Sequence, residues 1–290
     1  MTAVEQIRHF NRTVTQRVGA LHDAFLARSR PLGQARLLWE IGPDGARVRD
    51  LRSRLDLDSG YVSRLLRALE ADGLAVVHAD PADARTRVAR LTPAGLAERR
   101  ELDRLSDEQA ASILAPLSER QRDRLVAAMT EVERLLTASL VDIAVTDPDH
   151  PHARHCERAY FAELAERFEG GFDAATYRAA EDGGGLLLIA TLHGEPVACG
   201  ALKPGAIAKI KRMWVAPPVR ALGLGRRLLG ELEAQAAARG ATAVRLETNR
   251  ALTEAIGLYR AAGYREVDVF SDEPYAHHWF EKTLPGGPGS

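Results

Sequence analysis

In the first half of the chain, most segments space their hydrophobic residues as helices do. The stretch after Ser59 is the clearest, because Val62, Leu65, Leu66 and Leu69 stand at positions i, i+3, i+4 and i+7 and form one buried stripe. Gly42-Pro43, Asp72-Gly73 and Pro116 interrupt the pattern. We therefore expect helices over Val4–Ala27, Leu32–Ile41, Arg47–Leu55, Ser59–Ala71, 93–115 and 118–142.

A short β-hairpin separates these helices near residue 80. Leu74–His78 predicts one strand, Asp80–Ala84 a turn, and Arg85–Leu91 the returning strand. Thr92 and Pro93 then suit an N-cap followed by proline at the first helical position. The order helix, tight turn, helix, hairpin is that of a winged helix-turn-helix.

One face of the predicted helix after Ser59 carries short polar groups and arginines, which suit the major groove of DNA and its phosphates. Arginines at the hairpin tip suit the minor groove or phosphate. An ordinary solvated face is the alternative interpretation of the same residues. The candidate DNA-binding residues are Ser59, Tyr61, Ser63, Arg64 and Arg67 on the helix, and Arg85 and Arg87 on the hairpin.

About residues 4–142 resemble the MarR family of regulators. The motifs that carry the resemblance are Val48–Leu55, Ser59–Leu69, Glu70–Leu74, Asp80–Arg85 and Leu91–Gly95. The resemblance implies a homodimer in which the first helix and the last two helices form the dimerisation layer. Two recognition helices and two wings would then meet a pseudo-palindromic site on double-stranded DNA.

The second half of the chain alternates β-rich runs with helices. Thr146–His152 is rich in turn formers and suits a linker, so we expect two domains over 1–145 and 150–284. The fold class is a mainly α winged helix-turn-helix followed by an α/β domain. We expect strands over Leu186–Leu192, Pro196–Leu202, Ile207–Val215 and Val244–Thr248, and helices over Ala153–Phe168, Arg220–Arg239 and Leu252–Ala262.

A glycine-containing loop, Arg220-x-x-Gly223-x-Gly225, opens one of these helices. Glycines let backbone N–H groups approach an anion, and a helix N-terminus adds unpaired donors and a partial positive charge. Arg220, Arg226 and Arg227 add full charges. The loop lacks both the Gly-x-Gly-x-x-Gly pattern of dinucleotide folds and the Gly-Lys-Ser/Thr ending of phosphate loops. A pyrophosphate is the expected occupant.

About residues 150–284 resemble the Gcn5-related N-acetyltransferase (GNAT) family, which implies a mixed, mostly antiparallel sheet and acetyl-CoA as cofactor. The motifs that carry the resemblance are Met213–Pro217, Arg220–Gly225, Leu228-Leu229, Leu246–Asn249, Ala255 and Leu258–Tyr264. The first strand of this family is not obvious here, and either Ser139–Thr146 or no segment would supply it. The predicted helix Ala153–Phe168 would be its first helix.

The resemblance also implies roles for individual residues. Backbone groups of Met213 and Val215 would bind the pantetheine arm and the thioester carbonyl, Asn249 would touch the pantetheine or Tyr259, and Tyr259 would protonate the leaving thiolate. Backbone N–H groups from Ala221 to Arg226 would bind the pyrophosphate. The expected cofactor-binding set is Met213, Trp214, Val215, Arg220, Ala221, Leu222, Gly223, Leu224, Gly225, Arg226, Arg227, Asn249 and Tyr259.

The general base is where this sequence departs from much of the family. Many relatives carry a glutamate on the strand before the glycine loop, but Ile207–Val215 holds Lys209 and Lys211 instead. Glu247 is the best substitute, because it ends a strand close to Asn249. Second candidates are His277 and His278, and a water chain without a dedicated base is a further alternative.

Composition bears on four further points. A net charge of −1 argues neither for nor against nucleic acid. No apolar run reaches the ~18 residues that span a bilayer, and Met1–Arg17 has no apolar signal region, so we expect a cytosolic protein without membrane contact. Cys156 and Cys199 are expected to be reduced core thiols, and no metal site is expected. Residues 1–145 contain no lysine, which argues against self-acetylation of the DNA-binding face.

The leading hypothesis is a bifunctional protein, a DNA-binding transcriptional regulator and an acetyl-CoA-dependent N-acetyltransferase of a small primary amine. Glu163, Arg167, Glu273 and Tyr275 are candidates for the lining of the amine pocket. The alternative is a transcription factor whose acetyltransferase half senses acetyl-CoA or a metabolite without turnover.

Overall fold

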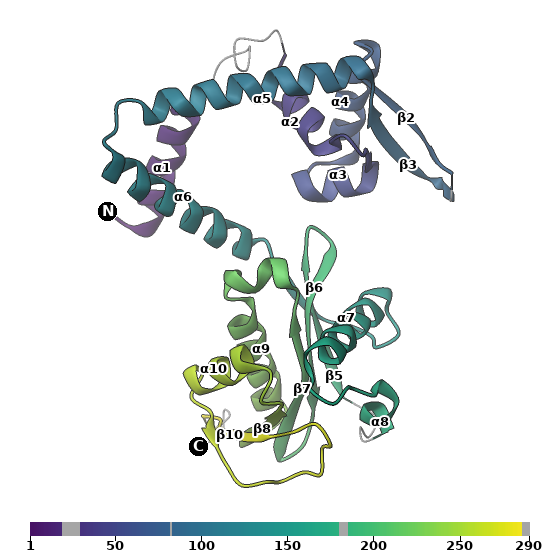
Figure 1. The fold of residues 1–290 in the computed structure, drawn as a ribbon, viewed down its shortest axis with the longest axis vertical. Coiled ribbons are helices and arrows are strands. Elements are labelled where there is room, and N and C mark those ends of the chain that lie inside the picture. Colours follow the sequence, from purple (N-terminus) through teal and green to yellow (C-terminus); the bar gives the residue numbers. More distant parts are fainter. Residues whose placement is uncertain (19–29, 82, 180–184, 286–290) are drawn as a thin grey trace. The chain divides into compact units, whose positions relative to one another are not determined.

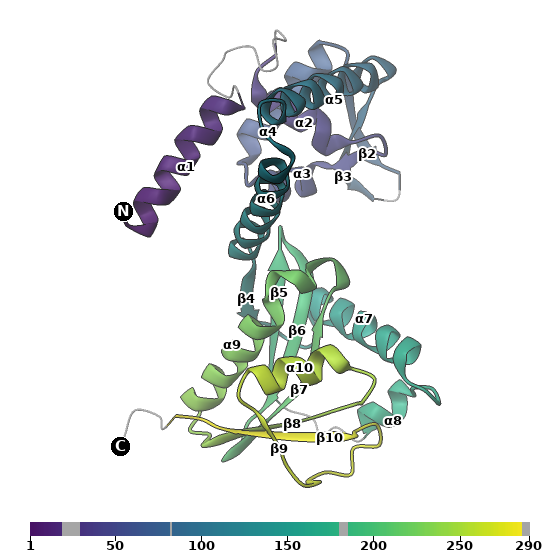
Figure 2. The same cartoon turned by 60° about the vertical axis from the view of Figure 1, so that its left-hand side comes forward.

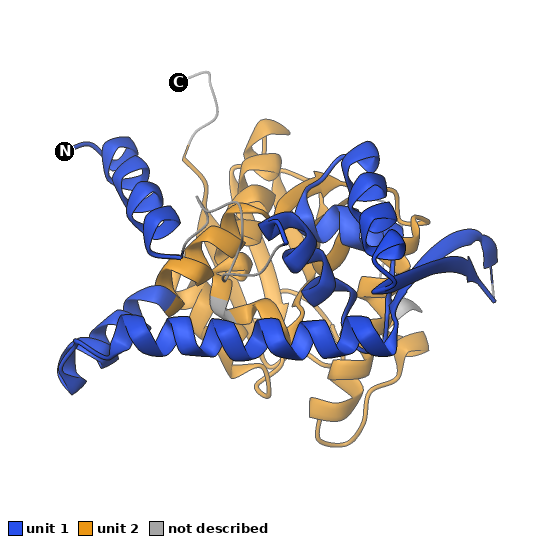
Figure 3. Cartoon of the chain, turned by 90° about the horizontal axis from the view of Figure 1, so that it is seen from above, with its two compact units in different colours: residues 1–129 blue, residues 130–290 orange. Residues whose placement is uncertain are grey.

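The computed structural model describes residues 1–18, 30–81, 83–179 and 185–285, which form two compact units, Met1–Met129 and Thr130–Ser290 (Figure 3). The part of the first predicted helix beyond residue 18, position 82 of the hairpin turn, and the tail after Pro285 lie outside the described residues. Each unit is considered by itself below.

The first unit holds a small helical domain with a three-stranded antiparallel sheet in the order β1-β3-β2 (Figure 1). The predicted winged helix-turn-helix order is confirmed. Its strands are β1 (Ala46–Arg47), β2 (Ala75–Asp80) and β3 (Asp83–Leu91). Its helices are α1 (Ala3–Arg17), α2 (Leu32–Ile41), α3 (Val48–Leu55), α4 (Ser59–Ala71), α5 (Pro93–Leu114) and α6 (Glu119–Ser139), the last of which crosses into the second unit.

Local sequence signals set the limits of α4 and α5. Asp58 caps α4 by accepting a hydrogen bond from the Tyr61 N–H at 2.9 Å, and Thr92 caps α5 through the Gly95 N–H at 3.1 Å. At the other end of α4, the Leu74 N–H closes a 2.8 Å bond to the Leu69 carbonyl. The predicted stripe of α4 is buried in the core of this unit, formed by Val62, Leu65, Leu66 and Leu69.

Helices α1 and α6 contrast with α4, because neither contributes a buried residue. Both nevertheless carry large hydrophobic side chains, and these side chains are exposed. They are Val4, Ile7, Phe10 and Val14 on α1, and Val126, Met129, Leu135 and Leu136 on α6. These two helices therefore present apolar surface that the described residues of this chain leave uncovered.

The second unit is built on a seven-stranded sheet in the order β4-β5-β6-β7-β8-β10-β9, in which only the pair β7–β8 is parallel. The predicted mixed, mostly antiparallel sheet is confirmed. Its strands are β4 (Asp142–Val145), β5 (Leu186–Leu192), β6 (Glu195–Lys203), β7 (Ile207–Val215), β8 (Ala243–Thr248), β9 (Arg265–Glu266) and β10 (His278–Thr283).

Helices cover both faces of this sheet (Figures 1 and 2). Alternation along the strands explains the two layers: Leu188 packs in the core with α9, while its neighbour Ile189 packs with α7 on the other face. The helices are α7 (Pro151–Arg167), α8 (Ala174–Ala179), the short 3-10 helix η2 (Pro217–Leu222), α9 (Leu224–Ala238) and α10 (Thr253–Ala261).

Several elements differ from the sequence-based expectation. The last helix of the first half ends at Ser139, and β4 follows within the segment that was the only candidate for a first strand. Since β4 pairs with β5, the predicted boundary at residue 145 falls after the first strand of the second sheet. The pattern gave no sign of β1, α8 or β9. Among the described residues, no helix is long and apolar enough to cross a bilayer.

Candidate functional site

The candidate site lies where β7 and β8 part. These parallel strands pair only from Ile207–Lys209 to Ala243–Arg245. Beyond that point, Arg212 takes a left-handed φ of 53°, and the register between β6 and β7 shifts. Two cavities open beside the diverging strands and share one wall, which consists of Tyr160, Leu164, Met213, Leu252, Ala255 and Tyr259.

We call the first cavity, of about 380 Å³, the cofactor groove, after the cofactor expected there. It runs beside the end of β7 and the start of α9. In α9, the Arg227 N–H donates the first hydrogen bond within the helix, to the Gly223 carbonyl at 3.2 Å. The N–H groups of Leu224, Gly225 and Arg226 come before this bond and are therefore not used within the helix. These donors and the positive end of the helix dipole fit a pyrophosphate.

Two glycines of the loop are required by geometry. Gly223 takes a φ of 71°, which L side chains adopt at a cost. At Gly225 a Cβ atom would stand 3.3 Å from Leu258 Cδ2 and 3.7 Å from Val215 Cγ2, so even a methyl group would crowd the groove. The loop therefore forms a cradle that its own residues leave open, and the predicted occupant fits it.

The three arginines of the loop do not converge on one point. Arg226 donates to the Ala261 carbonyl at the end of α10 at 3.1 Å, and Arg227 to the Ala138 carbonyl at 3.2 Å. Arg220 donates to the Val215 carbonyl at 2.9 Å and to Glu163. Arg220 and Arg226 line the groove, whereas Arg227 is not among its lining residues.

Glu163, on α7, collects several donors at the wall of the cofactor groove. Its carboxylate accepts bonds from Arg220 and Arg167, and from the Trp214 indole N–H at 2.9 Å. Burial by itself would raise the pKa of Glu163, but the bonds from Arg220, Arg167 and Trp214 hold it below the usual carboxyl value. Arg167 also bonds to Glu254 at 2.7 Å, so the network ties α7 to α10.

Tyr259 stands in the shared wall, as a proton donor to the leaving thiolate would have to do. It is 5% exposed. Burial, and after it the negative charge of Glu247, raises its pKa above the ordinary value, so the phenol keeps its proton near neutral pH. Asn249 lines the second cavity together with Tyr259; its side-chain amide donates to the Tyr275 carbonyl at 2.8 Å, and its side-chain oxygen accepts from the Ala251 N–H at 2.9 Å.

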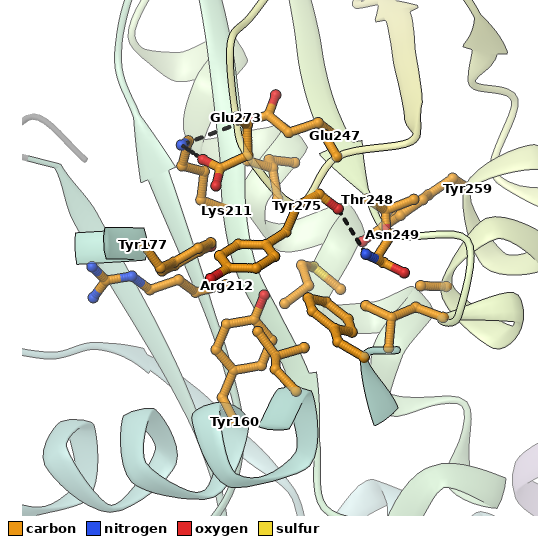
Figure 4. A pocket seen from close by; sticks show the side chains of 17 residues that line it. Tyr160, Tyr177, Lys211, Arg212, Glu247, Thr248, Asn249, Tyr259, Glu273 and Tyr275 are labelled. Carbon is orange, nitrogen blue, oxygen red and sulfur yellow. Dashed lines mark hydrogen bonds and ion pairs between the residues drawn. The ribbon is translucent and has the colours of Figure 1, made fainter. Parts of the chain in front are cut away.

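We call the second cavity, of about 60 Å³, the acceptor pocket, after the acceptor expected beside the cofactor (Figure 4). Rings from three separate segments form its walls: Tyr160 and Phe168 near α7, Tyr177 of α8, and Tyr275 of the loop before β10. Tyr275 is held in place by the Asp173 N–H, which donates to its hydroxyl at 2.8 Å. Burial raises the pKa of Tyr160, so this wall is neutral.

Three charged groups meet at one side of the acceptor pocket (Figure 4). Lys211 Nζ lies 3.3 Å from Glu247 Oε1 and 3.3 Å from Glu273 Oε2. The structure thus brings Glu247 into the pocket, next to the wall that holds Tyr259. His277 and His278 are absent from the residues that line the two cavities, and His278 bonds to Glu266 at 2.6 Å.

The other candidates for the amine pocket are divided between the two cavities. Glu273 and Tyr275 line the acceptor pocket, whereas Glu163 and Arg167 line the cofactor groove. Sequence analysis missed Tyr160. It stands seven positions before Arg167 on α7, so helical periodicity puts both residues on one face of the helix. Sequence analysis also missed Tyr177, for which the sequence offers no periodic signal.

The candidate DNA-binding residues lie on two elements of the first unit. Ser59, Tyr61, Arg64 and Arg67 are exposed on α4, and the Arg64 guanidinium lies 5.4 Å from the centre of the Tyr61 ring. Ser63 is half-buried, and its carbonyl accepts a bond from Arg67 at 3.2 Å. Arg85 and Arg87 are exposed on β3.

The tip of the hairpin is shaped by Asp83. Its carboxylate accepts bonds from the Arg85 N–H at 3.0 Å and from the Thr86 hydroxyl at 2.9 Å. These two bonds lower the pKa of Asp83, the backbone bond most. The side chain that precedes the two wing arginines is thus fixed as an anion, and its bonds tie together the first residues of β3, from which the arginines project.

Two family models match the chain. The acetyltransferase (GNAT) family matches residues 138–264, and the MarR family matches residues 29–86. A curated relative, the IAA acetyltransferase of Azospirillum brasilense, is 38% identical over 91 residues, which cover 30% of this chain and 58% of that relative. The chain thus spans little more than half the length of this relative.

Solved structures resemble each half separately. A probable transcriptional regulator from Pseudomonas aeruginosa is 25% identical, covers 45% of this chain and 99% of its own, and has a TM-score of 0.39. A GNAT family acetyltransferase from Elizabethkingia anophelis with acetyl-CoA bound is 17% identical, covers 50% and 99%, and has a TM-score of 0.37. Residues 29–86 thus match the MarR family, and residues 138–264 match the acetyltransferase (GNAT) family, whose cofactor is acetyl-CoA.

Proposed function

We propose that this chain is a DNA-binding regulator joined to an acetyl-CoA-dependent N-acetyltransferase that acts on a small primary amine. One observation carries the enzymatic part: the cofactor groove and the acceptor pocket share a wall that holds Met213 and Tyr259. A buried carboxylate, Glu247, lines the acceptor pocket. Cofactor, amine and a proton acceptor thus have adjoining places.

When bound, acetyl-CoA supplies an acetyl thioester, and the amine nitrogen forms the new C–N bond as the C–S bond breaks and the sulfur leaves, finally as a thiol. Glu247 has the role of general base that takes the proton from the amine. An amine with a pKa of ~10.4 is deprotonated near pH 7 at a cost of roughly 4.6 kcal/mol. The proton acceptor therefore carries the larger share of the barrier.

Tyr259 has the role of the acid that protonates the departing sulfur. Its raised pKa keeps the proton available near neutral pH. A thiol with a pKa of about 8.5 ionises at pH 7 at a cost of roughly 2 kcal/mol, so this proton transfer is worth less than the first. Met213 and Val215 line the groove, and their backbone has the role of holding the pantetheine arm.

The enzymatic proposal is tested by measuring CoA release from acetyl-CoA with a panel of primary amines, and separately with IAA, for which the Azospirillum relative is named. We expect turnover of at least one amine, lost in Glu247→Gln. Tight binding of acetyl-CoA without turnover of any compound, and without any effect of Tyr259→Phe on that binding, would instead support a sensor that does no chemistry.

The regulatory proposal rests on the exposed arginines of α4 and β3. Residues 1–145 contain no lysine. We expect Arg64→Ala or Arg85→Ala to weaken binding of a cognate operator by roughly 1–3 kcal/mol where the arginine contacts a base edge. Arg36→Ala on α2, where the arginine pairs with Glu40, is the control. If neither variant changes operator affinity in gel shifts, the proposed DNA-binding face is refuted.

We further propose a homodimer formed through the first helix and the last two helices of the MarR-like region. The exposed apolar side chains of α1 and α6 support it, because such surface is ordinarily covered by a partner. Light scattering on the full chain tests the proposal. A dimer that Leu136→Glu converts to a monomer is expected, and a monomeric wild-type protein would contradict it.

A further inference from the structure

Lys211 stands between two carboxylates that its single charge does not fully satisfy. The side chains of Glu247 and Glu273 are each 7% exposed, and each places one oxygen 3.3 Å from Lys211 Nζ. The second oxygen of each, Glu247 Oε2 and Glu273 Oε1, is buried without a hydrogen-bond partner among the described residues. Both residues line the acceptor pocket (Figure 4).

The charges around this pocket leave one negative charge uncompensated. Lys211 offsets one of the two carboxylates. Arg212, the other cation in the lining, forms an ion pair with Glu157 at 3.1 Å, outside the pocket. A buried anion without a partner is costly, and so is a buried acceptor oxygen without a donor. An ammonium group would remove both costs, since it brings one positive charge and three donors.

The remaining walls suit a cation with a short apolar chain. Tyr160, Phe168, Tyr177 and Tyr275 surround the space, and aromatic faces attract cations while their edges pack against methylene groups. A volume of about 60 Å³ has room for about five water-sized groups. The pocket thus suits a short, unbranched molecule better than a protein side chain on a folded surface.

The two carboxylates face different parts of the pocket. Glu247 acts electrostatically on Tyr259, in the wall shared with the cofactor groove, whereas Glu273 acts on Tyr177, which lines only the acceptor pocket. The first is therefore near the place where the acetyl group is transferred, and the second is near the aromatic end.

We propose that the acceptor is a short diamine, with Glu273 holding its second, non-reacting ammonium group while Glu247 faces the nitrogen that is acetylated. This inference rests on the proposed N-acetyltransferase function and names the substrate class of that site. It excludes an amino acid of the same length, because its carboxylate would meet two buried carboxylates.

The test compares three acceptors with a four-carbon chain: butylamine, putrescine and γ-aminobutyrate. Initial rates of CoA release are measured on the full chain at saturating acetyl-CoA. A charged hydrogen bond made only by the diamine predicts a kcat/KM for putrescine about 10- to 100-fold above that for butylamine. We expect γ-aminobutyrate to be the poorest of the three.

Variants assign this preference to Glu273. Glu273→Gln should bring the ratio of kcat/KM for putrescine to that for butylamine down toward one, and Glu273→Asp should recover part of it. Glu195→Gln, at the exposed first residue of β6, is the matched control and should keep the wild-type ratio. Circular dichroism of each variant confirms folding, and the wild-type comparison of the three amines stands without any variant.

Calorimetric titration of putrescine without acetyl-CoA separates the two proposals. Binding that Glu273→Gln weakens, with no turnover of any amine, would retain the diamine pocket and refute the enzyme. Turnover of butylamine at least as efficient as that of putrescine would retain the enzyme and overturn the diamine pocket. A ratio of kcat/KM values that Glu273→Gln leaves intact would overturn the pocket as well.

Discussion

The cofactor groove and the acceptor pocket share a wall but are built in opposite ways. One part of the groove is made by a single stretch of chain, from Met213 to Arg226, which presents backbone N–H groups at a helix start, and residues of α7 and of Leu252–Tyr259 line the rest. The pocket is assembled from side chains of α7, α8, β7, β8 and the loop before β10. Binding an anion through the backbone needs a local motif, whereas selecting an amine needs groups that only folding brings together.

This difference predicts that damage to one cavity should leave the function of the other nearly intact. Changes in the acceptor pocket should act on amine turnover without loss of acetyl-CoA affinity, and changes in the glycine loop should do the reverse. The shared wall, with Tyr259, is where both measurements should respond. Four variants test this separation, in order of decreasing expected effect.

Glu247→Gln is expected to have the largest effect. Without the carboxylate, no side chain takes the proton from the amine, whose pKa of ~10.4 lies roughly 3.4 units above pH 7. We therefore expect kcat/KM to fall by about 10³-fold. The dissociation constant of acetyl-CoA, measured by calorimetry, should change by less than about twofold, since Glu247 does not line the groove. A matching loss of acetyl-CoA affinity would contradict the separation of the two cavities.

Tyr259→Phe is expected to have a smaller effect and to lower kcat by up to about 30-fold. The reason is that the pKa of a thiol, about 8.5, lies only roughly 1.5 units above pH 7, so the thiolate leaves with less help. Its pH dependence is a second measurement. Burial, and then Glu247, raises the pKa of Tyr259, so the protonated form persists as the pH rises to the ordinary tyrosine value of about 10. A fall in kcat centred near pH 10 that disappears in Tyr259→Phe would refute this assignment.

Gly223→Ala should weaken acetyl-CoA binding by about 5- to 30-fold, because a φ of 71° costs a residue with a Cβ atom roughly 1–2 kcal/mol. A Cβ there would meet no atom within 4 Å, so the effect would come from the backbone. Gly230→Ala, inside α9 and equally open, is the control and should leave acetyl-CoA affinity unchanged. The ratio of kcat/KM for two amines should be the same in both variants.

Tyr275→Phe should have the smallest effect. It removes the hydroxyl that accepts the Asp173 N–H at 2.8 Å but keeps the ring in the wall. We expect the free energy of unfolding to fall by about 1 kcal/mol, measured by urea denaturation. Acetyl-CoA affinity should stay as in the wild type. A larger change in acetyl-CoA affinity than in stability would mean that this loop also shapes the groove.

Local patterns predicted much of the fold. The limits of α2, α4, β5 and β7 follow from capping residues, glycine or proline breaks and apolar runs, and the structure places them at the expected residues. Short elements were missed, because two residues in β1 or β9 are too few to show a period. The strand β4 was ambiguous for a similar reason: its four residues follow a long helix directly and gain their strand identity from pairing with β5.

The cofactor loop and the acceptor pocket also differ in how far the local sequence predicts their residues. Gly223 and Gly225 are recognisable in the sequence because each is needed for the conformation or close packing of its own segment. Glu273 and Tyr177 have no such local signature, since their positions beside Lys211 and Tyr160 depend on how α8 and a long loop return to the sheet.

The sequence by itself determined that this protein has a MarR-like region followed by a GNAT-like domain, and which glycine loop opens the helix beside the larger cavity. Only the tertiary structure decided which charges line the smaller cavity. Lys211, on the strand that was expected from the family resemblance to carry a glutamate, proves to lie between Glu247 and Glu273. Helix starts and glycine loops are set by interactions within a few residues, whereas the charge of a pocket is the sum over segments that are distant in the chain and adjacent in space.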